Sequence, residues 1–234
     1  MSKFRSQYVP EGILIVVSIL IAFAIDAWWE DRQHRAEEIR ILKALRAEFQ
    51  ENADRLPRYI EIRELDAALA ELLVQEIQEV GVGAKILVTP EQLMAFTVHG
   101  SFDAIRGAFD AMLQSGDLRY IQNQELRERL VRWPTLIADA VENDYFLRTI
   151  ASPRAFGYLA KRVDLGLVDQ INRCRAENSD EECPSASFEL EATRELSGVV
   201  SHIHGWSLEG ALELESLRQA TLGLVSVLDA ELEK

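Results

Sequence analysis

The sequence predicts an all-α protein: an N-terminal transmembrane helix that continues into a long amphipathic helix packed in an extramembrane helical bundle. An apolar run at residues 13–25 predicts the membrane helix. Beyond it, hydrophobic residues recur at three- and four-residue steps, and helix-capping residues precede several of these segments. The chain therefore divides into an N-terminal tail and transmembrane anchor, residues 1–29, and an acidic helical domain, residues 30–234.

The acidic charge of the chain lies entirely in the second part. The 234 residues carry a net charge of −14, whereas residues 1–29 sum to zero because they hold two basic and two acidic side chains. With 48% hydrophobic and 27% charged residues, the composition is that of a globular protein. An acidic domain repels phosphate groups, so nucleic acid is not expected as a partner.

The apolar run becomes long enough to cross a bilayer once its aromatic flanks are included. From Tyr8 to Trp29 there are 22 residues, which as a helix measure about 33 Å against a hydrocarbon core of ~30 Å. Tyr8, Trp28 and Trp29 then lie where membrane interfaces favour aromatic rings. A secretory signal cleaved after Ala22-Phe23-Ala24 and a buried core helix are the alternatives. The uninterrupted continuation into a charged helix favours the anchor, with the lipid bilayer as its first partner.

Ser18, Ala22 and Asp26 form a candidate contact face in this anchor. They are spaced by four residues, so they lie on one side of a helix. Small residues permit close approach of two helices, and a carboxylate in a membrane generally faces protein rather than lipid. The spacing predicts contact with a second copy of the chain or with another membrane protein. In the alternative, Asp26 reaches water beside the tryptophans and contacts no protein.

The two cysteines, Cys174 and Cys183, flank a polar, acidic loop. A single close pair of this kind predicts a disulfide in an oxidising compartment. A zinc site with His202 and His204 is the alternative, but the spacing of these four residues does not match known zinc motifs.

The orientation of the anchor has two opposing signals. Two basic residues precede the anchor and five follow it, which by the positive-inside rule would place the domain in the cytoplasm. Long domains translocate largely regardless of charge, so the disulfide favours a periplasmic or extracellular domain.

The remaining elements follow from periodicity and capping. A stripe from Ile39 to Leu56 predicts the helix that leaves the membrane, with a kink or restart at Pro57 and a second stripe in Ile62, Leu65, Leu69, Leu72 and Ile77. Residues 85–89 are expected to be extended. Caps predict further helices after Thr89, Ser101, Asn123 and Ser152, with a kink at Pro134. Helix is also expected over residues 187–200 and from Leu214 to Leu232.

Two stretches, "EGILIVVSILIAFAIDAWWEDRQ" and "SFDAIRGAFDAMLQSGDLRYIQNQELRERLVRW", give the chain a family resemblance. Together they resemble a widespread family of uncharacterised bacterial proteins anchored by one N-terminal helix. The second stretch carries the better signal, in the Ser115-Gly116 turn and the step from Leu118 to Ile121. The resemblance implies a single-pass protein of the bacterial inner membrane with a cytoplasmic N-terminus and a periplasmic main domain. It implies no reaction.

The sequence shows no catalytic motif, so the protein is expected not to be an enzyme and to hold no cofactor or metal. His202 and His204 are two residues apart, and on a helix they point about 200° away from each other. Ser207 lacks the glycine pattern of a nucleophile elbow. The predicted function is that of a membrane-anchored binding, assembly or accessory module acting through helix–helix contacts. The alternative is a periplasmic ligand-binding, sensor-like domain with a small molecule in a cavity.

Overall fold

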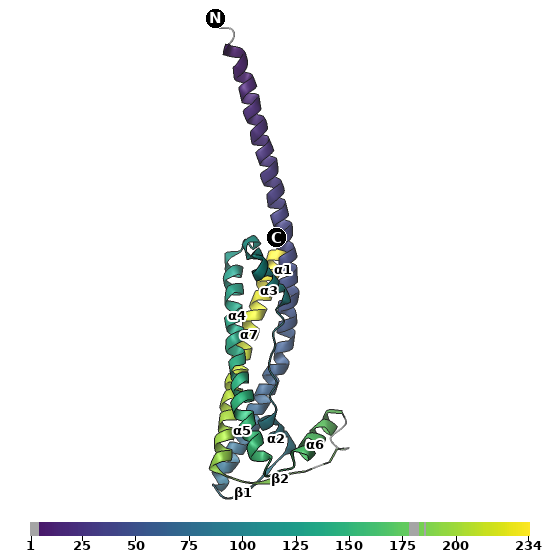
Figure 1. The fold of residues 1–234 in the computed structure, drawn as a ribbon, viewed down its shortest axis with the longest axis vertical. Coiled ribbons are helices and arrows are strands. Elements are labelled where there is room, and N and C mark those ends of the chain that lie inside the picture. Colours follow the sequence, from purple (N-terminus) through teal and green to yellow (C-terminus); the bar gives the residue numbers. More distant parts are fainter. Residues whose placement is uncertain (1–4, 178–182, 185) are drawn as a thin grey trace.

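The computed structural model describes the chain except for residues 1–4, 178–182 and 185, and except for the side chains of residues 5–12 and 176. Helices dominate it (Figure 1). In chain order the elements are α1 (Arg5–Val80), β1 (Lys85–Val88), α2 (Pro90–Thr97), α3 (Gly107–Ser115), η1 (Asp117–Tyr120), α4 (Gln124–Phe146), η2 (Leu147–Ala151), α5 (Ser152–Leu159), α6 (Leu165–Glu177), β2 (Phe188–Glu191) and α7 (Arg194–Leu232). Of the two short elements, η1 is a 3₁₀ turn and η2 a π turn.

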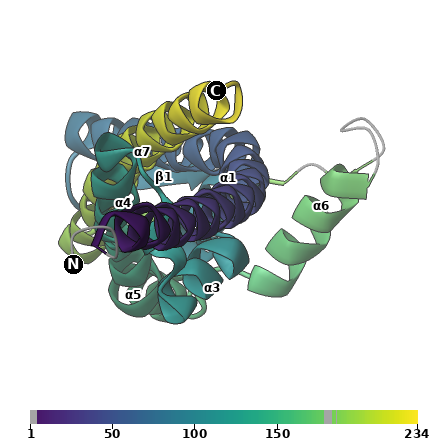
Figure 2. The same cartoon turned by 90° about the horizontal axis from the view of Figure 1, so that it is seen from above.

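The long helix α1 forms both the projecting stalk and one side of the domain. It has 76 residues, about 114 Å at 1.5 Å per residue. Every described side chain before Arg35 is exposed, and from there α7 and α4 run beside it (Figures 1 and 2). Helix α7 is antiparallel to α1, so the C-terminal end returns to the base of the stalk. There Arg35 Nη2 donates to the backbone oxygen of Glu231 at 3.2 Å.

The expected restart at Pro57 is wrong, and of the predicted second stripe only Leu69 and Ile77 pack in the core. Helix α1 continues through Pro57, between the buried residues Leu56 and Ile60. Because the helix is not interrupted, its buried face keeps the phase set before the proline. The residues that follow on that face are Arg63, Ala67, Ala70 and Leu73, whereas Ile62, Leu65 and Leu72 are exposed.

Ser101 does not cap a helix. Residues 101–106 are not helical, and α3 begins only at Gly107. Its first backbone N–H groups, of Ala108 and Phe109, donate to the Glu48 carboxylate of α1 at 2.6 and 3.0 Å. A carboxylate at a helix N-terminus satisfies unpaired donors and interacts favourably with the helix dipole. The cap therefore comes from a residue far away in the sequence.

The all-α class holds except for one small antiparallel sheet. The prediction for residues 85–89 is confirmed by β1, but Phe188–Glu191 forms β2 instead of a helix. In this pair Ile86 lies opposite Leu190, and both are buried. Outward-facing Lys85 and Glu189 form an ion pair on the other side. The expected caps at Thr89 and Asn123 are present: each side chain accepts a hydrogen bond from the backbone three residues on.

The domain has two apolar cores along its length. The core nearer the stalk joins α1, α3, α4 and the end of α7 around Phe49, Phe109 and Trp133, whose rings meet edge to face. The core farther from the stalk joins the end of α1, the sheet, α2, α5, α6 and the start of α7. Two of the three predicted amphipathic stripes, the one before Pro57 on α1 and the one after Leu214 on α7, supply the first core.

Candidate functional site

The anchor face of Ser18, Ala22 and Asp26 is fully accessible in this structure. All three side chains are exposed on the projecting part of α1. Ser18 Oγ donates to the backbone oxygen of Leu14 at 2.8 Å, so its hydroxyl is already satisfied within the helix. Asp26 makes no hydrogen bond or ion pair with any described residue. Ser18 therefore contributes small size to this face, and Asp26 contributes the unsatisfied acceptor.

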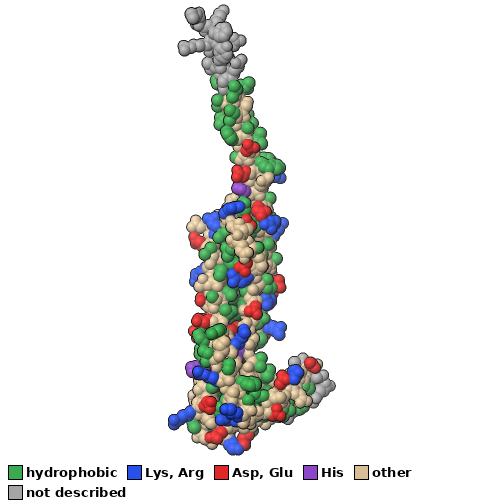
Figure 3. Space-filling model, viewed as in Figure 1, with side chains coloured by type: hydrophobic (Ala, Val, Ile, Leu, Met, Phe, Trp, Pro, Cys, Tyr) green, Lys and Arg blue, Asp and Glu red, His purple; other side chains and the backbone are tan. Residues whose placement is uncertain are grey.

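The stalk has the composition of a membrane span. One helix in the described part is long and apolar enough to cross a bilayer, with a mean hydropathy of 2.1 in its most apolar window. Hydrophobic side chains cover this segment up to the first charged groups (Figure 3). The Trp28 and Trp29 rings lie 6.5 Å apart, and the Arg32 guanidinium lies 5.6 Å from the Trp28 ring centre. Tyr8 belongs to α1, but its side chain lies outside the described residues.

The anchor face points away from the domain. Ala22 and Leu56, the latter in the centre of the buried face of α1, are about 160° apart at 100° per residue. Leu65 falls within about 20° of Ala22 on the same scale. Leu65 and Leu72 are 58% and 57% exposed on this side of the helix. One unobstructed side of α1 thus carries the anchor face in the stalk and two exposed leucines in the domain.

A groove of about 650 Å³ lies between α5 and the first half of α7. Its lining includes the cations Arg154, Lys161 and Arg194 and only one acid, Glu195. Its apolar wall includes Trp206, whose ring stacks on Phe146 of α4 at 5.5 Å and 20°. His202 also lines the groove, 5.1 Å from the Trp206 ring centre. The groove suits a small molecule by size and concentrates positive charge in an acidic protein.

A buried polar layer crosses the domain between the two cores and consists of Arg63, Asp66, His99 and Asp144. Arg63 donates to Asp144 Oδ1 from Nε at 2.8 Å and from Nη2 at 2.6 Å. It also donates to Asp66 Oδ2 at 3.1 Å and to the backbone oxygen of Gly100. His99 Nδ1 lies 3.2 Å from Asp66 Oδ2 and is the donor, because an ionised carboxylate only accepts.

The Arg63 and His99 side chains of this layer are shielded from solvent, whereas Asp144 also lines a second cavity of about 550 Å³. The side chains of Arg63 and His99 are 2% and 0% exposed. His99 Nε2 and Ser207 Oγ are buried without a hydrogen-bond partner among the described residues. No described cavity is lined by either of them. The layer joins α1, α4 and the segment before α3 by charge, which is a structural role.

One carboxyl at the edge of this layer is perturbed. Burial raises the pKa of Glu213 on α7, and nearby acidic side chains add to the effect. The Asn143 amide donates a hydrogen bond to Glu213 Oε2 at 2.8 Å and so partly lowers this pKa again. The net rise means that the ionised form of Glu213 is disfavoured in the folded protein.

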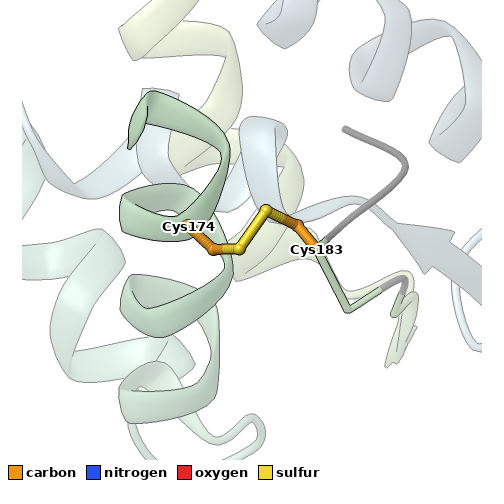
Figure 4. The surroundings of a disulfide bond; sticks show 2 residues. All are labelled: Cys174 and Cys183. Carbon is orange, nitrogen blue, oxygen red and sulfur yellow. A yellow bond between two sulfur atoms is a disulfide. The ribbon is translucent and has the colours of Figure 1, made fainter. Parts of the chain in front are cut away.

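The predicted disulfide is present. Cys174 in α6 and Cys183 in the segment that follows are bonded, with Cα atoms 5.7 Å apart (Figure 4). Helix α6 lies at the side of the domain, away from α1 and α7 (Figure 2). The bond therefore closes a peripheral loop and does not tie the long helices together.

The two paired histidines point in different directions, as their spacing on a helix predicts. His202 faces the groove, whereas His204 Nδ1 lies 3.1 Å from the backbone oxygen of Ala67 on α1. In the described residues no group of three His, Cys, Asp or Glu side chains is arranged to hold a metal ion.

No protein-family model matches the chain, and no curated protein or solved structure is similar to it. The family resemblance noted from the sequence therefore remains a prediction.

Sequence reasoning missed the groove, although one signal was present. Residues 148–163 contain four basic side chains and no acidic one, in a chain with 39 acidic and 25 basic residues. Such a local reversal of charge marks a candidate anion site. The polar layer had a weaker signal: Arg63 falls in phase with the buried residues Leu56 and Ile60. Two other members of the layer, His99 and Asp144, come from other segments, and no local pattern identifies them.

Proposed function

We propose that the protein is a single-pass, membrane-anchored, non-enzymatic assembly module in which α1 pairs side by side with a partner helix. The partner we propose is a second copy of the chain, and the alternative is another membrane protein. The observation that carries the proposal is the continuous exposed side of α1, with Ser18, Ala22 and Asp26 in the stalk and Leu65 and Leu72 in the domain.

A second copy suits this side of α1 for geometric reasons. Two anchors in one membrane run in parallel, and a twofold axis along α1 places each Leu65 and Leu72 opposite its own equivalent. Because each domain packs on the far side of its own α1, two such helices approach without a clash. Small residues in the stalk allow close contact, and Asp26 gains a partner that it lacks within its own chain.

The compartment proposed is the bacterial inner membrane, with a cytoplasmic N-terminus and a periplasmic domain. The disulfide between Cys174 and Cys183 supports it, because such bonds persist in oxidising compartments. Blocking free thiols at the moment of cell lysis tests this orientation. Both cysteines should escape alkylation, and their modification would place the domain in the cytoplasm.

A matched pair of variants tests the association. Ala22→Leu adds bulk on the anchor face, and Ala24→Leu adds the same bulk about 160° away on the helix. With the full chain in mild detergent, sedimentation velocity should show a dimer for the natural chain and for Ala24→Leu, and mainly monomer for Ala22→Leu. Equal behaviour of the two variants, or a natural chain that is monomeric and co-purifies with no other membrane protein, would refute the proposal.

Cross-linking tests the contact within the domain. Leu65→Cys should form an intermolecular disulfide in membranes, because the twofold axis brings the two copies of this position together. Val131→Cys is the matched control, since Val131 is 61% exposed on α4 and away from this side of α1. Equal cross-linking at both positions would show random collision, which the proposal does not permit.

A further inference from the structure

The α5–α7 groove holds three cations that form no ion pair with the acidic side chains that the structure describes. Arg154, Lys161 and Arg194 line it, and none of them forms an ion pair with a residue in the described part of the chain. Elsewhere on the described surface, pairs such as Arg129–Glu125 and Arg173–Asp169 are common. With three cations against the single acid Glu195, the lining of this groove carries a local positive charge in a chain of net charge −14, and such a surface attracts an anion.

The opposite wall of the groove offers flat apolar surface. Trp206 is held on one side by Phe146 and has His202 close beside it. Tyr158, 3% exposed, forms part of the floor, and its hydroxyl lies 3.0 Å from Thr193 Oγ1. The Tyr158 ring is already covered by the Arg162 guanidinium, 3.7 Å from its centre, so Trp206 is the ring that can stack with a flat ligand at little cost in conformational entropy.

The backbone keeps the groove open. Gly157 on α5 and Gly198 on α7 both line it, and a Cβ added at either would meet no atom within 4 Å. The π turn η2, which supplies Ile150 and Ala151 to the wall, is a rare element that occurs frequently at functional sites. The volume of about 650 Å³ lies within the usual range of ~300–1,000 Å³ for small-molecule sites.

The position of the groove excludes the lipid headgroups of the anchoring membrane. His204, next to the groove on α7, contacts Ala67 of α1. At 1.5 Å per residue, Ala67 lies about 57 Å along the helix from Trp29 at the expected membrane interface. The ligand must therefore come from solution.

We propose that this groove binds a small soluble organic anion that carries a phosphate, sulfonate or carboxylate group next to a flat apolar ring. The anionic group contacts Arg154, Lys161 and Arg194, and the ring packs against Trp206 and His202. This binding does not depend on the association of α1, so its failure would leave the assembly role intact.

Calorimetric titration of the full chain, held in nanodiscs of uncharged lipid, tests the proposal with naphthyl phosphate as the probe. Naphthol and inorganic phosphate each carry one half of its chemistry. The dissociation constant for naphthyl phosphate should be at least about tenfold lower than for either half, because both walls contribute. No saturable binding, or equal binding of naphthol, would overturn the proposal.

Variants place the probe in the groove. Arg154→Gln combined with Arg194→Gln should weaken binding by about tenfold or more, whereas Arg58→Gln, an exposed cation of α1, should leave it unchanged. Gly198→Phe should abolish binding by filling the groove. Gly205→Phe is its matched control, because Gly205 is also unobstructed but does not line the groove. Unchanged binding in the arginine variants, or equal loss in both phenylalanine variants, would overturn the proposal.

Discussion

Replacing Arg63 by methionine should strongly destabilise the domain. The Arg63 side chain is 2% exposed and is the only cation that contacts Asp144 within the described structure; Asp144 is itself 3% exposed. Without Arg63, Asp144 keeps one hydrogen bond, from the backbone N–H of Phe102 at 3.3 Å. Removing one partner of a buried pair costs roughly 3–5 kcal/mol, because the other charge remains buried and uncompensated.

The assay is thermal and urea unfolding of the full chain in mild detergent, followed by far-ultraviolet circular dichroism. For a domain of this size, the expected loss corresponds to a midpoint roughly 6–20 °C lower. Arg132→Met is the matched control, since Arg132 is exposed on α4, the helix that carries Asp144, and forms no ion pair with a described residue; it should change stability by less than about 0.5 kcal/mol.

A second variant separates charge from packing. Adding Asp144→Leu to Arg63→Met removes one of the two carboxylates that lose Arg63, and the other, Asp66, keeps its contact with His99. The double variant should therefore be more stable than Arg63→Met alone. If the free energies of unfolding of Arg63→Met and Arg132→Met differ by less than about 1 kcal/mol, or if the double variant loses further stability, the polar layer does not hold the helices together as argued.

Three further outcomes are expected. Glu213→Gln should raise the unfolding midpoint at neutral pH. Burial raises the pKa of Glu213 in the folded protein, so the ionised carboxylate lowers stability as the pH rises above 4.5, its ordinary pKa. Below pH 4.5 the variant and the natural chain should have equal midpoints. Thr221→Val should lower the free energy of unfolding in urea by about 1–3 kcal/mol, because the Trp133 Nε1–H group loses its acceptor, Thr221 Oγ1, at 3.1 Å. Thr221→Ser keeps a hydroxyl at this position and should lower it much less. Reducing the Cys174–Cys183 bond should speed tryptic cleavage in α6 and leave the main unfolding transition in place; a collapse of the whole domain would contradict the peripheral position of the bond.

Local signals predicted the elements that depend on neighbouring residues. The capping box at Thr89 and the cap at Asn123 are formed within four residues, so the sequence contains all their partners. The stripes before Pro57 and after Leu214 could also be predicted from helical periodicity alone, because their apolar side chains recur on one side of each helix. In the structure these side chains lie in the core nearer the stalk.

Errors arose where a distant residue competes with the local one. Ser101 was a plausible cap, but Glu48 of α1 binds the first N–H groups of α3 and moves its start to Gly107. Phe188 to Glu191 resembled the start of a helix, yet β1 offers an edge to pair with. In the stripe predicted from Ile62 to Ile77, the residues Ile62, Leu65 and Leu72 are exposed because the phase of α1 was set before Pro57, whereas Leu69 and Ile77 pack in the core.

The sequence by itself determined the apolar stalk, the helical class, the disulfide and the side of the helix that carries Ser18, Ala22 and Asp26, because each depends on composition or on spacing along one element. Only the tertiary structure decided the polar layer and the α5–α7 groove. Their residues come from segments far apart in the chain, and which of them meet depends on how α1, α4, α5 and α7 pack.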